Sequence, residues 1–244
     1  MKPACCLAIG GSDSCGGAGV QADLLAIEAQ GIKGCTVITA LTAQTPDAVI
    51  RIEKASLEQI EAEMRGIFSY YEVLAVKTGM LLDAQRVQLV AKLLAELHQG
   101  GVLVVDPVMV ASSGTRLLTE EACAELQASL FPLATLITPN IPETEVLLGE
   151  AIDSAEVAAE QLFSLYGRPV LLKGGHSKCL EEAEDVLFQK TGQRYFKQKR
   201  EAWSKEVSHG SGCRLASAIT ACLAKGESLE NSIAHAKASL STYS

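Results

Sequence analysis

Residues 73–105, VLAVKTGMLLDAQRVQLVAKLLAELHQGGVLVV, contain a short apolar run, a longer amphipathic segment and a second apolar run. The runs Val73–Lys77 and Val102–Val105 are short and rich in valine, which is typical of buried strands. Between them, Ala84–Gln99 repeats leucine and valine at the spacing of one helical face, and two glycines follow where a helix C-cap is expected. This order predicts one strand–helix–strand unit of a parallel sheet.

The same alternation continues along the chain. It shows no repeat of fixed period, no low-complexity tract and no linker rich in proline or serine. We therefore expect residues 1–244 to form a single α/β domain with a mostly parallel sheet. Further strands are expected at Ala4–Ile9, Gly34–Ile38, Val49–Ile52, Leu136–Thr138 and Val170–Lys173. Further helices are expected at Val20–Gln30, Leu57–Tyr71, Glu120–Ser129, Pro142–Leu148, Ala155–Tyr166, Cys213–Ala224 and Leu229–Ser241.

The pattern changes after Lys173. Polar and apolar residues alternate in Asp185–Gln189 and in Arg194–Gln198, on either side of the dipeptide Thr191-Gly192. Two alternating runs around a glycine turn are typical of a β-hairpin. The sequence therefore predicts an antiparallel hairpin at one edge of the sheet.

Composition limits the partners and the location of the protein. The 244 residues carry 29 acidic and 21 basic side chains, for a formal net charge of −8. Such a balance does not favour nucleic acid or anionic membranes as partners, and no apolar run approaches the roughly 20 residues of a membrane-spanning helix. The eight cysteines are scattered without a C-x-x-C pair, and the first apolar run stops at Gly10, too short for a signal peptide. We expect a cytoplasmic protein with reduced cysteines.

Residues with chemical character follow the first two predicted strands, and ligands of open α/β sheets bind at the carboxyl ends of strands. Residues 10–19, GGSDSCGGAG, are rich in glycine, which lets the backbone approach a small ligand. The segment is not a Walker A loop, and a turn that packs a helix onto the sheet is its simpler interpretation. The amide of Gln44 can donate and accept at the edge of a pyrimidine or pyridine ring. A solvated loop residue is the simpler interpretation of Gln44.

Two neighbouring strand ends carry oxygen ligands. Asp106 follows the strand at Val102–Val105, and Asn140 and Glu143 follow the strand at Leu136–Thr138. Oxygen ligands of this kind can hold a hydrated Mg²⁺. Asn140 and Glu143 also fit a helix cap, in which the asparagine accepts a backbone N–H and the glutamate reaches back. The two roles are compatible, because a capping glutamate can still face a metal-bound water.

Residues 208–213, SHGSGC, precede a predicted helix. Successive backbone N–H groups at a glycine-rich helix start form an anion site, and the same positive end is expected to lower the pKa of Cys213. This arrangement suits phosphate transfer, whereas a glycine turn that caps a core helix, with an inert cysteine, is the simpler interpretation. Lys173 ends a buried strand and is placed to meet a triphosphate.

Seven segments together resemble the ribokinase-like superfamily and, within it, the hydroxymethylpyrimidine and phosphomethylpyrimidine kinases of thiamine biosynthesis. In the family's order and spacing they are GGSDSCGGAGVQADL, CTVITALTAQT, VKTGML, VVDPVMVASSG, ITPNIPETEVLLG, VLLKGGH and HGSGC. The resemblance implies a three-layer α/β/α fold and a homodimer, the usual oligomeric state of the superfamily. It also implies transfer of the γ-phosphate of ATP, with Mg²⁺, to 4-amino-5-hydroxymethyl-2-methylpyrimidine and then to its monophosphate.

The resemblance further implies roles for single residues. Around the pyrimidine it places Gln44, Gly11, Asp23, Met80 and Val108. The anion hole falls on Gly210, Ser211 and Gly212. Cys213 stands where most sugar kinases of the superfamily carry an aspartate base, and would accept the proton of the substrate hydroxymethyl group. The nucleotide and its phosphates would meet Asn140, Lys173 and His209, and the metal would lie near Asp106 and Glu143.

Three other interpretations remain. A pyridoxal or pyridoxine kinase of the same fold also phosphorylates a hydroxymethyl group on a nitrogen heterocycle, and Gln44 favours the pyrimidine without deciding the matter. A non-catalytic pyrimidine-binding protein would keep the fold without turnover, but the intact Cys213, Asn140 and Glu143 argue against it. A cysteine hydrolase that uses Cys213 and His209 would lack a visible third group to orient the base.

Overall fold

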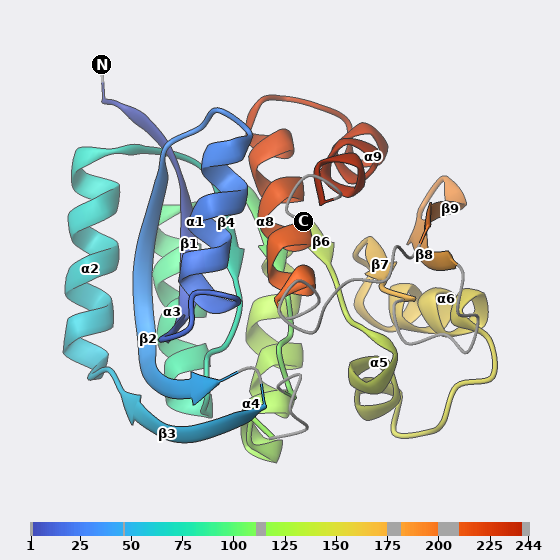
Figure 1. Ribbon diagram of the computed structural model, residues 1–244, viewed down its shortest axis with the longest axis horizontal. Helices are drawn as coiled ribbons and strands as arrows, with labels where there is room; N and C mark the ends of the chain where they lie inside the picture. The colour runs from blue at the N-terminus through green and yellow to red at the C-terminus, as the bar shows by residue number, and fades with distance from the viewer. Residues whose placement is uncertain (1, 46, 111–115, 175–181, 200–209, 241–244) are drawn as a thin grey trace.

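The computed structural model describes residues 2–45, 47–110, 116–174, 182–199 and 210–240, which are arranged in three layers (Figure 1). In this part of the chain the middle layer is a sheet of nine strands in the order β3-β2-β1-β4-β5-β6-β7-β8-β9. The strands are β1 (Ala4–Asp13), β2 (Gly34–Thr45), β3 (Ala48–Lys54), β4 (Glu72–Thr78), β5 (Val102–Val105), β6 (Leu136–Ile137), β7 (Val170–Leu172), β8 (Glu182–Gln189) and β9 (Gly192–Lys199).

The sheet is parallel at its centre and antiparallel at both edges. β1 pairs in parallel with β2 and β4, and parallel pairing continues from β4 through β5 and β6 to β7. At one edge β8 and β9 form an antiparallel hairpin beside β7, which confirms the predicted hairpin. At the other edge β3 runs antiparallel to β2, a direction that the sequence did not indicate.

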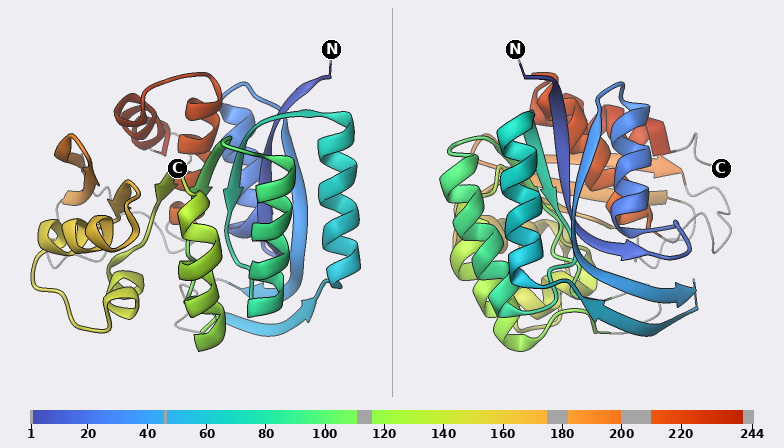
Figure 2. Two further views of the ribbon diagram at one scale, coloured as in Figure 1. Left: turned by 180° about the vertical axis from the view of Figure 1, so that it is seen from behind. Right: turned by 90° about the vertical axis from the view of Figure 1, so that its left-hand side faces the viewer.

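Helices cover both faces of the sheet (Figure 2). One face carries α1 (Gly19–Ala29), α8 (Ser211–Ala224) and α9 (Leu229–Leu240). The other carries α2 (Leu57–Tyr70), α3 (Ala84–Leu97), α4 (Glu120–Glu125), α5 (Ile141–Leu148) and α6 (Ala155–Tyr166). Among the described residues, no helix combines the length and the apolar character that crossing a bilayer would need.

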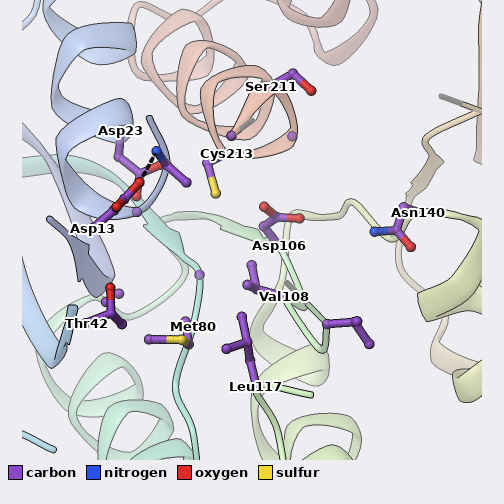
Figure 3. Close-up of a pocket in the computed structure, with 18 of the residues that line it drawn as sticks. Asp13, Asp23, Thr42, Met80, Asp106, Val108, Leu117, Asn140, Ser211 and Cys213 are labelled. Atoms are coloured by element: carbon purple, nitrogen blue, oxygen red, sulfur yellow. Dashed lines mark hydrogen bonds between the residues drawn. The ribbon is translucent and has the colours of Figure 1, made fainter. Parts of the chain in front are cut away.

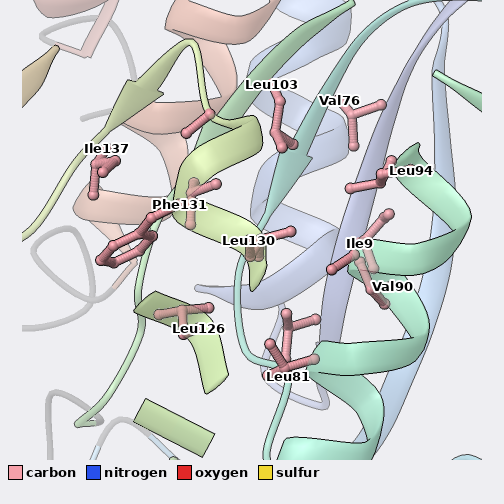
Figure 4. Close-up of a cluster of buried hydrophobic side chains, with 14 of the residues drawn as sticks. Ile9, Val76, Leu81, Val90, Leu94, Leu103, Leu126, Leu130, Phe131 and Ile137 are labelled. Carbon is pink, nitrogen blue, oxygen red and sulfur yellow. The ribbon is translucent and has the colours of Figure 1, made fainter. Parts of the chain in front are cut away.

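Side chains of each central strand alternate between the two faces of the sheet. Leu7 and Ile9 of β1 belong to the large apolar cluster beneath α2, α3 and α4 (Figure 4). Cys6 and Ala8 point the other way and pack with Ala221 of α8. The α1–α8 face of the sheet is thus built from small side chains, which allow these two helices to approach the strands closely.

Two predicted strands are longer than expected. β1 continues through Gly10–Asp13 and β2 through Gln44, because the two strands keep pairing beyond Ile38, for example Asp13 with Thr42. The first glycines of the predicted loop and the predicted loop residue Gln44 therefore lie on strands. The polar and glycine-rich composition of these segments concealed their pairing.

One predicted helix is shorter than expected. Instead of a continuous helix over Glu120–Ser129, α4 ends at Glu125 and a π-helical turn follows at Leu126–Leu130. A 3₁₀ turn at Phe131–Leu133 then leads into β6, and Pro132 in that turn has no N–H to donate. The other predicted strands and helices are all present, with ends shifted by a few residues.

Candidate active site

A cavity of about 560 Å³ lies at the carboxyl ends of the parallel strands, where α1 and α8 begin (Figure 3). Its lining includes every predicted site residue except one: Gly11, Asp23, Gln44, Met80, Asp106, Val108, Asn140, Glu143, Lys173, Gly210, Ser211, Gly212 and Cys213. The exception, His209, lies outside the described residues. Residues from both ends of the sequence therefore meet at one edge of the sheet.

The glycine-rich segment is held by Asp13 and Gln21. The carboxylate of Asp13 accepts hydrogen bonds from the backbone N–H of Cys15 and of Ala18, both at 2.8 Å. The amide of Gln21 accepts from the N–H of Asp13 and donates to the hydroxyl of Ser12. These bonds fix the turn that joins β1 to α1, and the same turn forms a wall of the cavity.

Gln44 lies near the end of β2, and hydrogen bonds to its backbone hold it in place. Its carbonyl accepts from the hydroxyl of Ser14 at 3.1 Å and from the thiol of Cys15 at 2.7 Å, and its N–H donates back to Ser14 at 3.0 Å. No described residue hydrogen-bonds its side-chain amide, and the residue lines the cavity. The amide is therefore available to a ligand, as the ring-reading role requires.

An apolar wall stands beside Gln44. Met80 lies against Gly11, where any side chain would collide with the Met80 methyl group. Val108 reaches the cavity from the segment after β5 with a φ of 44°, a conformation that is costly for a β-branched residue. Met80, Val108 and Leu117 thus give one side of the cavity a surface that can pack against a flat ring.

The start of α8 has the geometry that the predicted anion site requires. The helix begins at Ser211, two residues earlier than predicted, and Gly210 is its N-cap with a φ of 77°. The first backbone bond of the helix runs from the N–H of Arg214 to the carbonyl of Gly210 at 3.0 Å. The four preceding N–H groups, from Gly210 to Cys213, have no acceptor within the helix. The first three of these groups, those of Gly210, Ser211 and Gly212, are called the anion hole below, because together with the helix dipole they favour an anionic ligand.

Cys213 is partly exposed in the cavity. Burial raises the pKa of its thiol to about 11, Asp23 and Asp106 add to the increase, and Lys77 and Lys173 oppose it. The expectation that the helix start lowers this pKa is therefore wrong, because loss of hydration outweighs the neighbouring cations. At neutral pH only a small thiolate fraction can accept a proton from a substrate.

Lys173 lies between the end of β7 and the anion hole. Its ammonium contacts Asp106 at 2.6 Å, and Thr138 donates to the same carboxylate oxygen at 3.2 Å. A Cβ atom at Gly212 would stand 3.2 Å from the Lys173 ammonium, so the cation is close to the anion hole. Burial acts to lower the pKa of Lys173, but Asp106 and Glu143 outweigh it and the net direction is upward. Lys173 therefore stays charged.

Asn140 and Glu143 form the predicted helix cap at the start of α5. The side chain of Asn140 accepts from the N–H of Glu143, and one Glu143 oxygen accepts from the N–H of Asn140, both at 2.9 Å. The other Glu143 oxygen accepts from the N–H of Met109 at 3.1 Å. Glu143 is buried, and burial raises its pKa although Lys173 opposes the change. The cap links α5 to the segment that carries Val108.

The oxygen ligands fit one hydrated Mg²⁺. Asp106 uses its Oδ1 for Lys173 and Thr138, and its Oδ2 has no hydrogen-bond donor among the described residues. Both Glu143 oxygens already accept backbone N–H groups, so Glu143 is suited to a metal-bound water and not to the metal itself. Mg²⁺ needs few protein ligands and keeps several waters, which suits a site with one available carboxylate oxygen.

The sequence did not single out Lys77, which is the penultimate residue of β4, whereas Lys173 directly follows β7. Its ammonium lies 2.8 and 2.9 Å from the two carboxylate oxygens of Asp23, and Ser217 of α8 donates to that carboxylate at 2.8 Å. Asp23 therefore lines the cavity as the partner of a buried lysine. The signal that could have identified Lys77 is a lysine near the end of a buried strand, since the same signal identified Lys173.

Solved structures that share this fold include two small-molecule kinases. A phosphomethylpyrimidine kinase from Clostridium difficile 630 matches with a TM-score of 0.84 and 35% identity, covering 100% of this chain and 99% of that one. A Bacillus subtilis pyridoxal kinase in complex with ADP matches with a TM-score of 0.86 and 32% identity, covering 98% and 90%. The fold and the site define a kinase of the ribokinase-like class.

Sequence comparison identifies the family within that class. The family model for phosphomethylpyrimidine kinase matches residues 13–243, and the chain belongs to this family. A hydroxymethylpyrimidine/phosphomethylpyrimidine kinase of Rhizobium meliloti (strain 1021) is 43% identical over 96% of this chain and 88% of its own length. One of Haemophilus influenzae is 40% identical over 95% and 87%.

Proposed function

We propose that this protein transfers the γ-phosphate of ATP to the hydroxymethyl group of 4-amino-5-hydroxymethyl-2-methylpyrimidine and then to the resulting monophosphate, in thiamine biosynthesis. One observation carries the proposal: the free amide of Gln44, the thiol of Cys213 and the anion hole line a single cavity. Phosphoryl transfer to an alcohol on a heterocycle needs ring recognition, a proton acceptor and neutralisation of phosphate charge, all in one place. The names of the relatives support the same reaction.

The amide of Gln44 binds the polar edge of the pyrimidine. Its carbonyl accepts from the 4-amino group and its NH₂ donates to the neighbouring ring nitrogen. Met80 and Val108 pack against the ring from the apolar wall of the cavity. This arrangement directs the hydroxymethyl group toward Cys213 and α8, because the ring is held at the opposite side, at the end of β2.

The first transfer moves one proton and one phosphoryl group. The hydroxymethyl oxygen loses its proton to the sulfur of Cys213 and forms a bond to the γ-phosphorus, while the bond from that phosphorus to the β-phosphate oxygen breaks and ADP leaves. The anion hole donates to the oxygens of the transferring group, and Lys173 adds positive charge on the nucleotide side. A Mg²⁺ at Asp106, with waters that reach Glu143, would neutralise the phosphates when bound. Asn140 and His209 complete the proposed nucleotide side.

Product analysis tests the proposed function. Purified protein is given ATP and Mg²⁺ with the hydroxymethylpyrimidine, its monophosphate or pyridoxine, and ADP release and product masses are measured. We expect product masses that correspond to one and then two added phosphates on the pyrimidine. Activity on pyridoxine alone would assign the protein to the pyridoxal kinases, and ligand binding without turnover would assign it to the non-catalytic binding proteins. A cytoplasmic location belongs to the same proposal.

A further inference from the structure

Two buried lysine–aspartate pairs flank Cys213. Lys173 pairs with Asp106 on the nucleotide side, and Lys77 pairs with Asp23 beneath the start of α1. Both cations act to lower the pKa of the Cys213 thiol, and Lys77 acts more strongly than Lys173. Lys77 and Cys213 line the same cavity, although the proposed function gives Lys77 no role.

Three elements and a glycine hold Lys77 in place. β4 carries the lysine, α1 supplies Asp23, and α8 supplies Ser217, one helical turn after Cys213. Two residues further along the chain, a Cβ atom at Gly79 would stand 2.9 Å from the ammonium, so the glycine leaves room for it. The side chains of Lys77 and Asp23 are each only 1% exposed. The ammonium is therefore fixed and largely desolvated.

The ammonium retains its charge and one unused donor. Burial acts to lower the pKa of Lys77, but the carboxylates of Asp23 and Asp106 outweigh it and the net direction is upward. An ammonium group has three N–H donors, and two of them are used by Asp23. Among the described residues, no other acceptor binds Lys77. A buried ion pair of this kind contributes little to the stability of the fold, because the cost of desolvation offsets much of the attraction.

The second transfer creates a need for such a cation. A phosphate monoester carries about −1.5 to −2 charges at neutral pH, whereas the hydroxymethyl group of the first acceptor is neutral. The described residues that line the cavity include four carboxylates and two lysines. Of these lysines, Lys173 lies by Asp106 on the nucleotide side, and Lys77 lies next to Gly79 and Met80, by the pyrimidine pocket. Of the two lysines, Lys77 is therefore the one on the acceptor side of the cavity.

We propose that Lys77 determines whether the site accepts a phosphorylated acceptor: its ammonium, fixed by Asp23 and Ser217, holds the phosphate of the pyrimidine monophosphate during the second transfer. This inference rests on the proposed function and specifies how one site serves two acceptors. In the second transfer an oxygen of the acceptor phosphate forms a bond to the γ-phosphorus, and the bond from that phosphorus to ADP breaks. The dianionic acceptor has no proton to lose. The second transfer therefore depends mainly on the Lys77 cation and not on Cys213 as a base.

Affinities for the two acceptors test the inference. The dissociation constants of the hydroxymethylpyrimidine and its monophosphate are measured by calorimetry without ATP, for the wild-type protein and for Lys77→Met. We expect the variant to lose at least tenfold more affinity for the monophosphate than for the neutral pyrimidine, since only the former carries charge to pair. The ratio of kcat/KM for the two acceptors should shift in the same direction. Equal losses, or a loss for the neutral pyrimidine alone, would overturn the inference.

Two further variants separate a specific role from a loss of packing. Lys77→Met leaves a buried carboxylate unpaired, so the double variant Lys77→Met/Asp23→Asn replaces the pair by neutral groups of similar size. Lys237→Met is the matched control, because Lys237 and Asp185 form a buried pair at 2.5 Å between α9 and β8, outside the cavity lining. The double variant should reproduce the shifted ratio and the control should keep the wild-type ratio. The same shift in the control would overturn the inference, whereas a wild-type protein that binds both acceptors but phosphorylates neither would overturn only the proposed function.

Discussion

Cys213 is the proposed acceptor of the hydroxymethyl proton, yet burial raises the pKa of its thiol and disfavours the thiolate. We expect Cys213→Ala to lower kcat for the first transfer by about 10²–10⁴-fold, the usual worth of a positioned acid or base. The dissociation constant of the hydroxymethylpyrimidine should change little, because the ring is held at Gln44. The second transfer should be slowed less, since the dianionic monophosphate has no proton to remove. Equal loss of affinity and of rate would indicate a structural role for Cys213.

The direction of the Cys213 pKa predicts how its reactivity depends on pH. With a pKa of about 11, the thiolate fraction rises about tenfold for each pH unit from pH 7 to 10. We expect alkylation of Cys213 by iodoacetamide, followed by mass spectrometry of its peptide, to accelerate by that factor. Cys15 is exposed and reports on an accessible thiol in the same sample. A plateau below pH 9 would contradict the high pKa.

Gln44 is expected to separate binding of the heterocycle from binding of the nucleotide. Gln44→Ala removes two hydrogen bonds to the ring, each worth about 0.5–1.5 kcal/mol, so the affinity for the pyrimidine should fall about tenfold or more. The affinity for ATP should stay within twofold, because the Gln44 amide is proposed to bind the ring alone. Titration calorimetry with each ligand measures both values, and an unchanged pyrimidine affinity would remove the ring-reading role.

At the scale of elements, the start of α8 depends on Gly210. This glycine has a φ of 77°, and a side chain there would collide with the carbonyl of Gly17. We expect Gly210→Ala to cost more than about 2 kcal/mol of unfolding free energy and to abolish transfer, since the left-handed conformation alone costs an alanine about 1–2 kcal/mol. Urea denaturation and the kinase assay measure the two effects.

Gly226 provides the matched control for that substitution. It has a φ of 83°, but a Cβ atom there would meet nothing within 4 Å. Gly226→Ala should therefore cost only the conformational strain, about 1–2 kcal/mol, and should keep full activity. Equal losses of stability and of activity in the two variants would contradict this prediction. They would show that the close contact between α8 and the glycine-rich segment is not what holds the anion hole in place.

The sequence predicts elements well where their hydrophobic period is uninterrupted. The strand–helix–strand unit at residues 73–105 is found as expected, because its buried strands and amphipathic helix each follow a single pattern. The ends of β1 and β2 were not predicted, since Gly10–Asp13 owes its extended form to pairing with a neighbouring strand and not to local preference. The π-helical turn at Leu126–Leu130 likewise has no local signal.

The site could be predicted in its parts but not in its internal contacts. Motifs at strand ends identified the residues that now line one cavity, because parallel strands bring their carboxyl ends together. The pairing of Asp23 with Lys77 depends on how α1 sits over β4, which no local spacing reveals. The pKa of Cys213 was predicted in the wrong direction for the same reason, since burial is a property of the folded molecule.

At the scale of the whole molecule, the cavity draws on strands and helices from one end of the chain to the other, so ligand binding should stabilise the entire fold. At a pyrimidine concentration 100 times the dissociation constant, the free energy of unfolding should rise by about 2.7 kcal/mol. Thermal denaturation at increasing pyrimidine concentration measures the effect. Cys213→Ala should keep the shift and Gln44→Ala should reduce it at the same pyrimidine concentration, and an undiminished shift in Gln44→Ala would locate binding elsewhere. The single domain and the homodimer stay predictions.

The contact between Gly17 and Gly210 joins segments that a ribosome makes far apart in time. At about 5–20 residues per second, the helix that carries the anion hole is synthesised on the order of 10–40 s after the glycine-rich segment that packs against it. β2, which carries Gln44, and the segment after β4, which carries Met80, are complete well before that. A nascent chain therefore lacks its phosphate site for much of its synthesis, and substrates that need this site cannot guide folding until almost the whole protein has emerged.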